Sequence, residues 1–227
     1  MTKFTQFFFT FLFPCLCLAK PLDIFFGTGG RGSEGIYHAT FNTDNGKFTP
    51  SKLAAKIGSP GFLTTHPNGK FLYSLGRWDG SSGVLGYHIG PKGELKEFTR
   101  MVCPDGGGAH IAVHPSGKFL LTAQYGGGSV ALFPIDKNGK LEEPSVTEHE
   151  GGSKVVERRQ ESPHPHWAGF SPDGNYALIP DLGLDQIVIY KVDTKKPAII
   201  PHGIGQSVPG GGPRHMRFST DGKFIYL

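Results

Sequence analysis

Cysteine is scarce in this 227-residue sequence, which contains three. Cys15 and Cys17 fall in an amino-terminal apolar stretch that we interpret below as a cleaved leader, so Cys103 alone would remain in the mature chain. This excludes an intrachain disulfide there. Cys103 lies between expected strands with no partner base that could activate it. We therefore expect it to be a small buried hydrophobic residue.

Long runs of one charge are also missing. The net charge is +4, and no block of basic residues is longer than the pairs Arg158-Arg159 and Lys195-Lys196. Such a sequence lacks the basic surface of a nucleic-acid-binding protein, so no nucleic-acid partner is expected. The longest apolar run, Phe7 to Leu18, is too short to span a bilayer comfortably, and no membrane span is expected.

The amino terminus has the pattern of an export signal. Lys3 supplies a positive charge, residues 7–18 form an apolar core, and Cys17-Leu18-Ala19 ends in small residues where a signal peptidase cleaves. The competing interpretation is a first β-strand, which the triple phenylalanine and Pro14 fit poorly. We expect a signal peptide over residues 1–19 and a secreted or periplasmic protein, or a cytoplasmic one if this stretch is not a leader.

Glycine and proline are abundant, with 34 and 18 residues, and the glycines recur between short apolar runs. Four segments superpose without gaps, beginning at Gly61, Ala109, His166 and Arg214, and their turn glycines are spaced by 48, 57 and 48 residues. A repeat of about 50 residues is typical of propellers and solenoids. The sequence thus predicts an all-β fold, a β-propeller of four-stranded antiparallel blades.

Each repeat is expected to supply four strands, A to D. In the repeat that begins at Ala109 these are His110 to His114, Lys118 to Tyr125, Ser129 to Asp136, and Leu141 to about Glu148. No helical pattern separates them.

The two ends of the sequence fall at different phases of the repeat. After the leader, residues 22–27, 35–41 and 48–55 match strands B, C and D, so the first blade is expected to lack strand A. The last residues, 224–227, match part of a strand B. We therefore expect about four blades of an incomplete ring within a single domain over residues 20–227. An open sheet edge would make such a chain aggregate or require a partner.

The sequence resembles the seven-bladed β-propeller lactonase family, which includes the propeller type of 6-phosphogluconolactonase and the fungal carboxymuconate cyclase. The motifs that carry the resemblance are SPHPHWAGFSPDGNYALIPDLGLDQI, AVHPSGKFLLTAQYGGGSVALFPI and GGGPRHMRFSTDGKFIYL. The resemblance extends over residues 22–227 in order and in register. It implies a site with His166 and Arg214 on neighbouring blades, and an acidic partner expected just beyond Leu227.

The repeat points to the same two residues. The positions eight residues before the turn glycines hold Gly61, Ala109, His166 and Arg214, and the next positions hold Phe62, His110, Trp167 and His215. Because strand A is the innermost strand, these residues should form a ring at one mouth of the central channel. The longer spacing adds residues 153–161 in the loop before His166, where binding residues tend to lie.

The residue types fit the opening of a lactone, which is an internal ester. Hydrolysis requires a base to activate water and a positive group to stabilise the oxyanion. His166 could be the base and Arg214 the stabilising group, with His110, His164 and His215 shaping the pocket or binding anionic groups. The structural alternatives are a hydrogen-bonded turn histidine at 166 and a solvated charge at 214.

Other patterns are given structural interpretations. His66 and His114 precede proline in the A–B turns and should support those turns. His164 and His166 could share a metal, but a zinc site requires a third ligand at a suitable spacing, so we expect no metal and no cofactor. The glycine runs 106–108, 126–128 and 210–212 lack the helix of a phosphate-binding loop and should form tight turns.

The leading hypothesis is therefore a lactone hydrolase, by resemblance most like 6-phosphogluconolactonase, with a small-molecule lactone as its partner. Export would favour an unphosphorylated substrate. Two alternatives stay open: a carboxymuconate cycloisomerase using the same histidine and arginine, and a non-catalytic propeller that serves as a binding scaffold.

Overall fold

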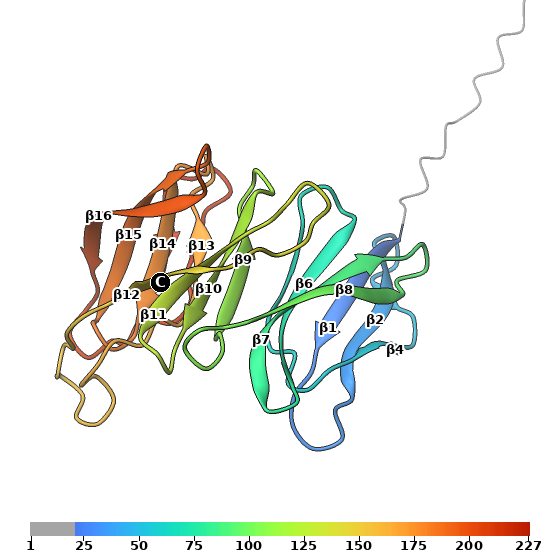
Figure 1. The fold of residues 1–227 in the computed structure, drawn as a ribbon, viewed down its shortest axis with the longest axis horizontal. Coiled ribbons are helices and arrows are strands. Elements are labelled where there is room, and N and C mark those ends of the chain that lie inside the picture. Colours follow the sequence, from blue (N-terminus) through green and yellow to red (C-terminus); the bar gives the residue numbers. More distant parts are fainter. Residues whose placement is uncertain (1–20) are drawn as a thin grey trace, which may run out of the picture.

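The computed structural model describes residues 21–227, and the leader expected at residues 1–19 lies outside the described residues. Within the described part the regular elements are all β-strands, and no helix there is long and apolar enough to cross a membrane. Four antiparallel sheets follow one another from blue to red in Figure 1, and a hairpin comes after them. We call these five units blades 1 to 5.

The strand bounds are as follows. Blade 1 holds β1 (Leu22–Gly27), β2 (Gly35–Asn42), β3 (Lys47–Phe48) and β4 (Lys52–Lys56). Blade 2 holds β5 (Leu63–Thr65), β6 (Phe71–Trp78), β7 (Ser81–Ile89) and β8 (Leu95–Val102). Blade 3 holds β9 (His110–Val113), β10 (Phe119–Gln124), β11 (Ser129–Pro134) and β12 (Ser145–Glu148). Blade 4 holds β13 (Gly169–Phe170), β14 (Tyr176–Asp181), β15 (Gln186–Asp193) and β16 (Ala198–Gln206), and blade 5 holds β17 (Arg217–Phe218) and β18 (Ile225–Tyr226).

The strand order confirms the predicted blades. In blades 2, 3 and 4 each strand pairs with the next one along the chain, so strands A to D lie side by side. Blade 1 begins with β1 in the place of strand B, as expected. Its strand D differs from the prediction, because β3 and β4 both pair with β2 and are separated by residues 49–51. Pro50, which has no N–H to donate to the ladder, lies in this break.

The hydrophobic core lies between blades. Strand β10 shows why: Phe119, Leu121 and Ala123 pack toward blade 4, whereas Leu120 packs toward blade 2. Successive side chains of a strand point to opposite faces, so an inner strand that is buried on both faces needs apolar residues throughout. Cys103 is buried in the core between blades 2 and 3, as the sequence predicts.

The histidines of the A–B turns link one blade to the next. His66 Nε2 donates to the backbone oxygen of Gly117 at 3.0 Å, and His114 Nε2 donates to the backbone oxygen of Gly174 at 2.9 Å. In both turns Nδ1 accepts a backbone N–H two residues further on, which fixes the ring. The structural role predicted for these two histidines is confirmed, and it joins neighbouring blades as well as supporting the turn.

The innermost strands line a channel. Val113 of β9 donates its N–H to Thr64 of β5, and β9 lies beside β13 on its other side. A cavity of about 770 Å³ runs along these strands, with His110 and Trp167 among its lining residues near one end and Pro115 and Pro172 near the A–B turns. We call the end at which the A strands begin the mouth.

Candidate functional site

Three of the predicted site residues meet at the mouth. The Arg214 Nε–H donates to His166 Nε2 at 3.2 Å, although the two residues belong to different blades. The His215 ring stands edge-on to the His166 ring, with 5.1 Å between centroids. The structure thus brings His166, Arg214 and His215 together, in the arrangement expected from the repeat.

His166 precedes its strand instead of beginning it. By the repeat, this strand is expected to begin at Trp167, the equivalent of His110 in β9, but β13 contains only Gly169 and Phe170. The reason is that two nearby backbone N–H groups form hydrogen bonds with different partners. The His166 N–H donates to Pro180 O at 3.0 Å, whereas the Ala168 N–H donates to His110 Nδ1 of blade 3 at 3.4 Å. The ladder is interrupted between these two bonds, and His166 is held at the mouth by the end of β14.

His110 lies deeper than the other site residues and is buried. Its ring packs between Phe62 and Trp167, at centroid distances of 4.6 and 5.2 Å. Burial lowers the pKa of His110 to about 3, so the imidazole is neutral at pH 7. His110 can therefore shape the channel wall, but as a neutral group it cannot supply a positive charge for anion binding.

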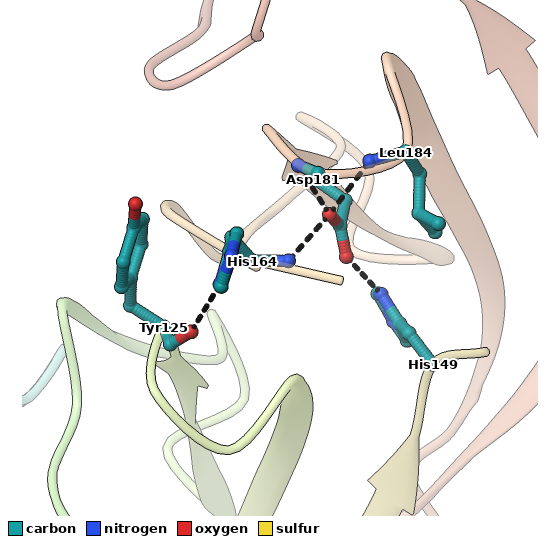
Figure 2. A network of polar contacts seen from close by, with 6 residues as sticks. Tyr125, His149, His164, Asp181 and Leu184 are labelled. Carbon is teal, nitrogen blue, oxygen red and sulfur yellow. Dashed lines mark hydrogen bonds and ion pairs between the residues drawn. The ribbon is translucent and has the colours of Figure 1, made fainter. Parts of the chain in front are cut away.

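His164 contacts Tyr125, and the Tyr125 ring also lies edge-on to the His166 ring, with 5.5 Å between centroids. Its ring stacks on Tyr125 at 4.5 Å with an interplanar angle of 14°, and its Nδ1–H donates to the Tyr125 backbone oxygen at 2.9 Å (Figure 2). This bond fixes the orientation of the His164 ring, which lies on the same aromatic side chain that contacts His166. Among residues 21–227 no group of three His, Cys, Asp or Glu side chains is placed to hold a metal ion.

Asp181 holds the segment that carries the two histidines. Its Oδ1 accepts the backbone N–H groups of His164 at 2.7 Å, Gly183 at 2.9 Å and Leu184 at 3.2 Å, and its Oδ2 accepts Nδ1–H of His149 at 2.7 Å (Figure 2). The carboxylate is fully buried. A buried carboxylate with this many donors is well satisfied, so it can fix the backbone two residues before His166.

Asp185 holds the segment that carries Arg214. Its two oxygens accept the N–H of Gly210 at 2.7 Å and of Gly212 at 2.8 Å, within the glycine run that leads to Arg214. Burial would raise the pKa of Asp185, but these N–H donors hold it below its usual range. Gly210 and Gly212 both have left-handed φ angles, of 73° and 56°, which glycine adopts readily. The predicted tight turn is confirmed here, and its N–H groups bind a carboxylate of the protein itself.

Sequence reasoning did not identify Asp181 and Asp185 as part of the site. The only signal was the five-residue segment 181–185, Asp-Leu-Gly-Leu-Asp, between two strands, which is typical of a turn. In the structure this B–C turn of blade 4 positions His166 through one aspartate and Arg214 through the other.

The electrostatics of the mouth favour a neutral His166. Burial is the largest cause of a lowered His166 pKa, and the positive charge of Arg214 is the second. Because Nε2 accepts a hydrogen bond from Arg214, the ring proton of the neutral form resides on Nδ1, which is buried and has no partner in residues 21–227. His166 thus presents an unprotonated nitrogen beside the positive charge of Arg214, which are the two groups needed to activate water and stabilise an oxyanion.

Comparison with known proteins supports the fold. The sequence model of the family described as "Lactonase, 7-bladed beta-propeller" matches residues 23–227. Among curated proteins, the 6-phosphogluconolactonase of Bacillus subtilis is 38% identical over 197 residues, which are 86% of this chain and 56% of that protein. The 6-phosphogluconolactonase of Formosa agariphila is 31% identical over 205 residues, 88% of this chain and 58% of that protein.

A solved structure has a similar fold. The periplasmic gluconolactonase of Pseudomonas aeruginosa superposes with a TM-score of 0.79 and 30% identity, covering 91% of this chain and 61% of that one. The chain therefore spans less than two thirds of the length of these relatives.

Proposed function

The chain belongs to the seven-bladed β-propeller lactonase family and carries part of that propeller, and from this premise we propose that it is a lactone hydrolase. The reaction is the opening of a sugar lactone to the aldonic acid, as the names of its relatives indicate. The observation that carries the proposal is the contact between Arg214 Nε and His166 Nε2 at the mouth.

In the proposed mechanism His166 acts as the base. Its Nε2 removes a proton from water while the water oxygen attacks the lactone carbonyl carbon. The resulting oxyanion is stabilised by the Arg214 guanidinium. When the intermediate collapses, the bond between the carbonyl carbon and the ring oxygen breaks. The ring oxygen then takes the proton back from His166, giving a hydroxyl group and a carboxylic acid that ionises.

The contact between Arg214 and His166 has a consequence for this cycle. In the free protein the Arg214 N–H occupies the lone pair of His166 Nε2 that must accept the water proton. Arg214 is exposed, so its side chain is free to move. Binding of a lactone would draw the guanidinium toward the carbonyl oxygen and release Nε2 for water.

The names of the relatives favour hydrolysis over the cycloisomerase alternative, since these proteins are called lactonases. We also propose that residues 1–19 are a signal peptide and that the protein acts outside the cytoplasm. The lactonase from Pseudomonas aeruginosa is named a periplasmic gluconolactonase, which is compatible with this location. An exported enzyme would meet unphosphorylated lactones.

The test is hydrolysis of D-glucono-1,5-lactone and of its 6-phosphate, measured as the release of acid at constant pH. We expect wild-type activity on at least one lactone and its loss in the His166→Gln variant. The matched control is His202→Gln, since His202 is exposed on the outermost strand β16 of the same blade. Equal activity of wild type and His166→Gln would refute the proposed role of His166, and no wild-type activity on any lactone would refute the function.

A further inference from the structure

The Tyr125 side chain of blade 3 contacts two histidine rings of blade 4. Its ring stacks on His164 with 4.5 Å between centroids, and it lies edge-on to His166 with 5.5 Å between centroids and an interplanar angle of 83°. Both separations fall in the range of about 4.5 to 7 Å at which aromatic rings attract one another. The mechanism proposed above uses His166 but assigns no role to Tyr125.

Tyr125 is held in place from both blades. It directly follows β10, and its backbone oxygen accepts the Nδ1–H of His164 at 2.9 Å. The His164 backbone is held in turn by Asp181, whose Oδ1 accepts the His164 N–H at 2.7 Å (Figure 2). The side chains of Asp181 and of His149, which donates to it, are both buried. The Tyr125 ring is therefore fixed by a hydrogen-bonded network that does not include the His166 side chain.

The His166 ring, by contrast, has a single hydrogen bond. In the histidines of the A–B turns, His66 and His114, both ring nitrogens form hydrogen bonds. In His166 only Nε2 has a partner, Arg214, whereas Nδ1 is buried without a partner in residues 21–227. The proposed mechanism breaks this one bond, when Arg214 moves toward the carbonyl oxygen. During the reaction the His166 ring is then held by packing.

The reaction requires that the His166 ring keep one orientation. Rotation about the Cβ–Cγ bond of a histidine has two broad preferred orientations, so a ring without hydrogen bonds turns over readily. A half turn would place the carbon Cε1 where Nε2 stood, and this carbon cannot take a proton from water. Two rings pack against His166, those of Tyr125 and His215. His215 is exposed, whereas Tyr125 is half-buried and anchored to His164.

We propose that Tyr125 is a positioning residue, whose ring, anchored on His164, keeps the His166 ring in the orientation that presents Nε2 to the reacting water. The ring makes these contacts, so the phenol hydroxyl is not required. His164 acts in the same role from behind Tyr125 and needs no contact with the lactone. This inference rests on the proposed function, and it adds a residue that acts through His166 without touching the reacting atoms.

The first measurement is independent of catalysis. Nitrogen NMR of the neutral His166 ring distinguishes its protonated nitrogen from its unprotonated one. Wild type and Tyr125→Phe should show one form, with the proton on Nδ1, because Nε2 accepts the bond from Arg214. In Tyr125→Leu, which removes the aromatic contact, the ring should exchange between orientations, and its nitrogen shifts should lie between those of the two pure tautomers.

Tyr176→Leu is the matched control for this experiment. Tyr176 also contacts a histidine ring, that of His202, with 5.0 Å between centroids. It is the first residue of β14, next to the A–B turn of blade 4 and therefore at the end of the blade opposite to the mouth. The His166 spectrum of this variant should match that of wild type.

The second measurement is kcat and KM for lactone hydrolysis. Tyr125→Leu should lower kcat by about tenfold, since a misplaced catalytic group costs up to about 100-fold, and should leave KM within about twofold. Tyr125→Phe and Tyr176→Leu should both keep kcat within about twofold of wild type. His164→Leu removes the hydrogen bond and the stacking behind Tyr125, so it should change the spectrum and kcat in the same direction as Tyr125→Leu. It replaces Tyr125→Leu if thermal melts show that this variant does not fold.

Four results would overturn the inference. They are an unchanged His166 spectrum in the folded leucine variants, an unchanged kcat in Tyr125→Leu, a loss in Tyr125→Phe equal to that in Tyr125→Leu, and the same loss in Tyr176→Leu. A higher KM with unchanged kcat in His164→Leu would contradict the role given to His164, because it would indicate direct binding of the lactone. The parent function fails in a different way. If the spectra change as expected but wild type hydrolyses no lactone, Tyr125 still orients His166 and lactone hydrolysis is refuted.

Discussion

Arg214 and His166 lie 48 residues apart in the sequence, one repeat, and the Arg214 Nε–H donates to His166 Nε2 at 3.2 Å. The contact follows from the propeller, because equivalent positions on successive blades come together at the channel mouth. It places a cation beside the imidazole that the proposed mechanism uses as a base.

This pair makes the pH dependence of the activity predictable. Burial, followed by the Arg214 charge, lowers the pKa of His166, so the base stays unprotonated to below its ordinary value of 6.5. The value of kcat/KM should therefore rise with pH through an ionisation below pH 6.5 and then level off. Arg214→Gln removes a charge that opposes protonation, so the pKa of His166 should rise.

The measurement for this prediction is an NMR titration of the His166 ring in both proteins. Arg217→Gln serves as the control, because Arg217 is exposed on β17 and is not among the groups that lower the His166 pKa. An unchanged or lower pKa of His166 in Arg214→Gln would show that the two side chains do not interact in solution.

Asp185 should matter for both stability and activity, since it binds the backbone that leads to Arg214. In Asp185→Asn a neutral amide has to face two backbone N–H donors and the Gln160 amide. We expect a loss of about 2 kcal/mol in the free energy of unfolding, the scale of hydrogen bonds to a charged group, together with a fall in kcat/KM. Urea denaturation and the lactone assay measure the two effects.

Asp193→Asn is the matched control for that experiment. Asp193 also accepts backbone N–H groups in a turn of blade 4, from Lys195 and Lys196, but it lies in an exposed turn. Its substitution should leave kcat/KM unchanged. If the two variants behave alike, Asp185 does not position Arg214.

His110 should make the fold sensitive to acid. Burial lowers its pKa in the folded protein to about 3, whereas the unfolded chain binds the proton near pH 6.5. Below pH 6.5 the unfolded state therefore binds more protons, and stability falls as the pH decreases toward 3. His110→Gln removes this group, so its free energy of unfolding should fall less between pH 7 and pH 4 than that of wild type. Parallel urea titrations at each pH test this, and identical slopes would contradict a buried neutral His110.

Much of the fold could be predicted because the repeat is local. Turn glycines and alternating apolar runs identify the strands, and the phase of the repeat places His166, Arg214 and His215 in one ring. The break in strand D of blade 1 and the short β13 were missed, since they depend on which backbone groups find a partner across the sheet or across blades.

The two aspartates that position the site residues could not be predicted from the sequence for a similar reason. Asp181 and Asp185 bind backbone groups that lie 17 to 27 residues away along the chain, at His164, Gly210 and Gly212. No local pattern encodes those partners. The position of the loop 153–161 was predicted from the longer repeat, but its anchoring by the Gln160 side chain, which donates to Leu182 O and Asp185 Oδ1, depends on the neighbouring turn.

A double-mutant cycle on kcat/KM for lactone hydrolysis is the most direct test of the account, using wild type, His166→Gln, Arg214→Gln and the double variant. Each single substitution should reduce kcat/KM on the order of 100-fold or more, because each removes a group that acts in the transition state. Groups that act as a unit lose their effect together, so the double variant should be about as active as the worse single variant. Fully additive losses, or single variants with wild-type activity, would contradict the claim that His166 and Arg214 form one catalytic pair.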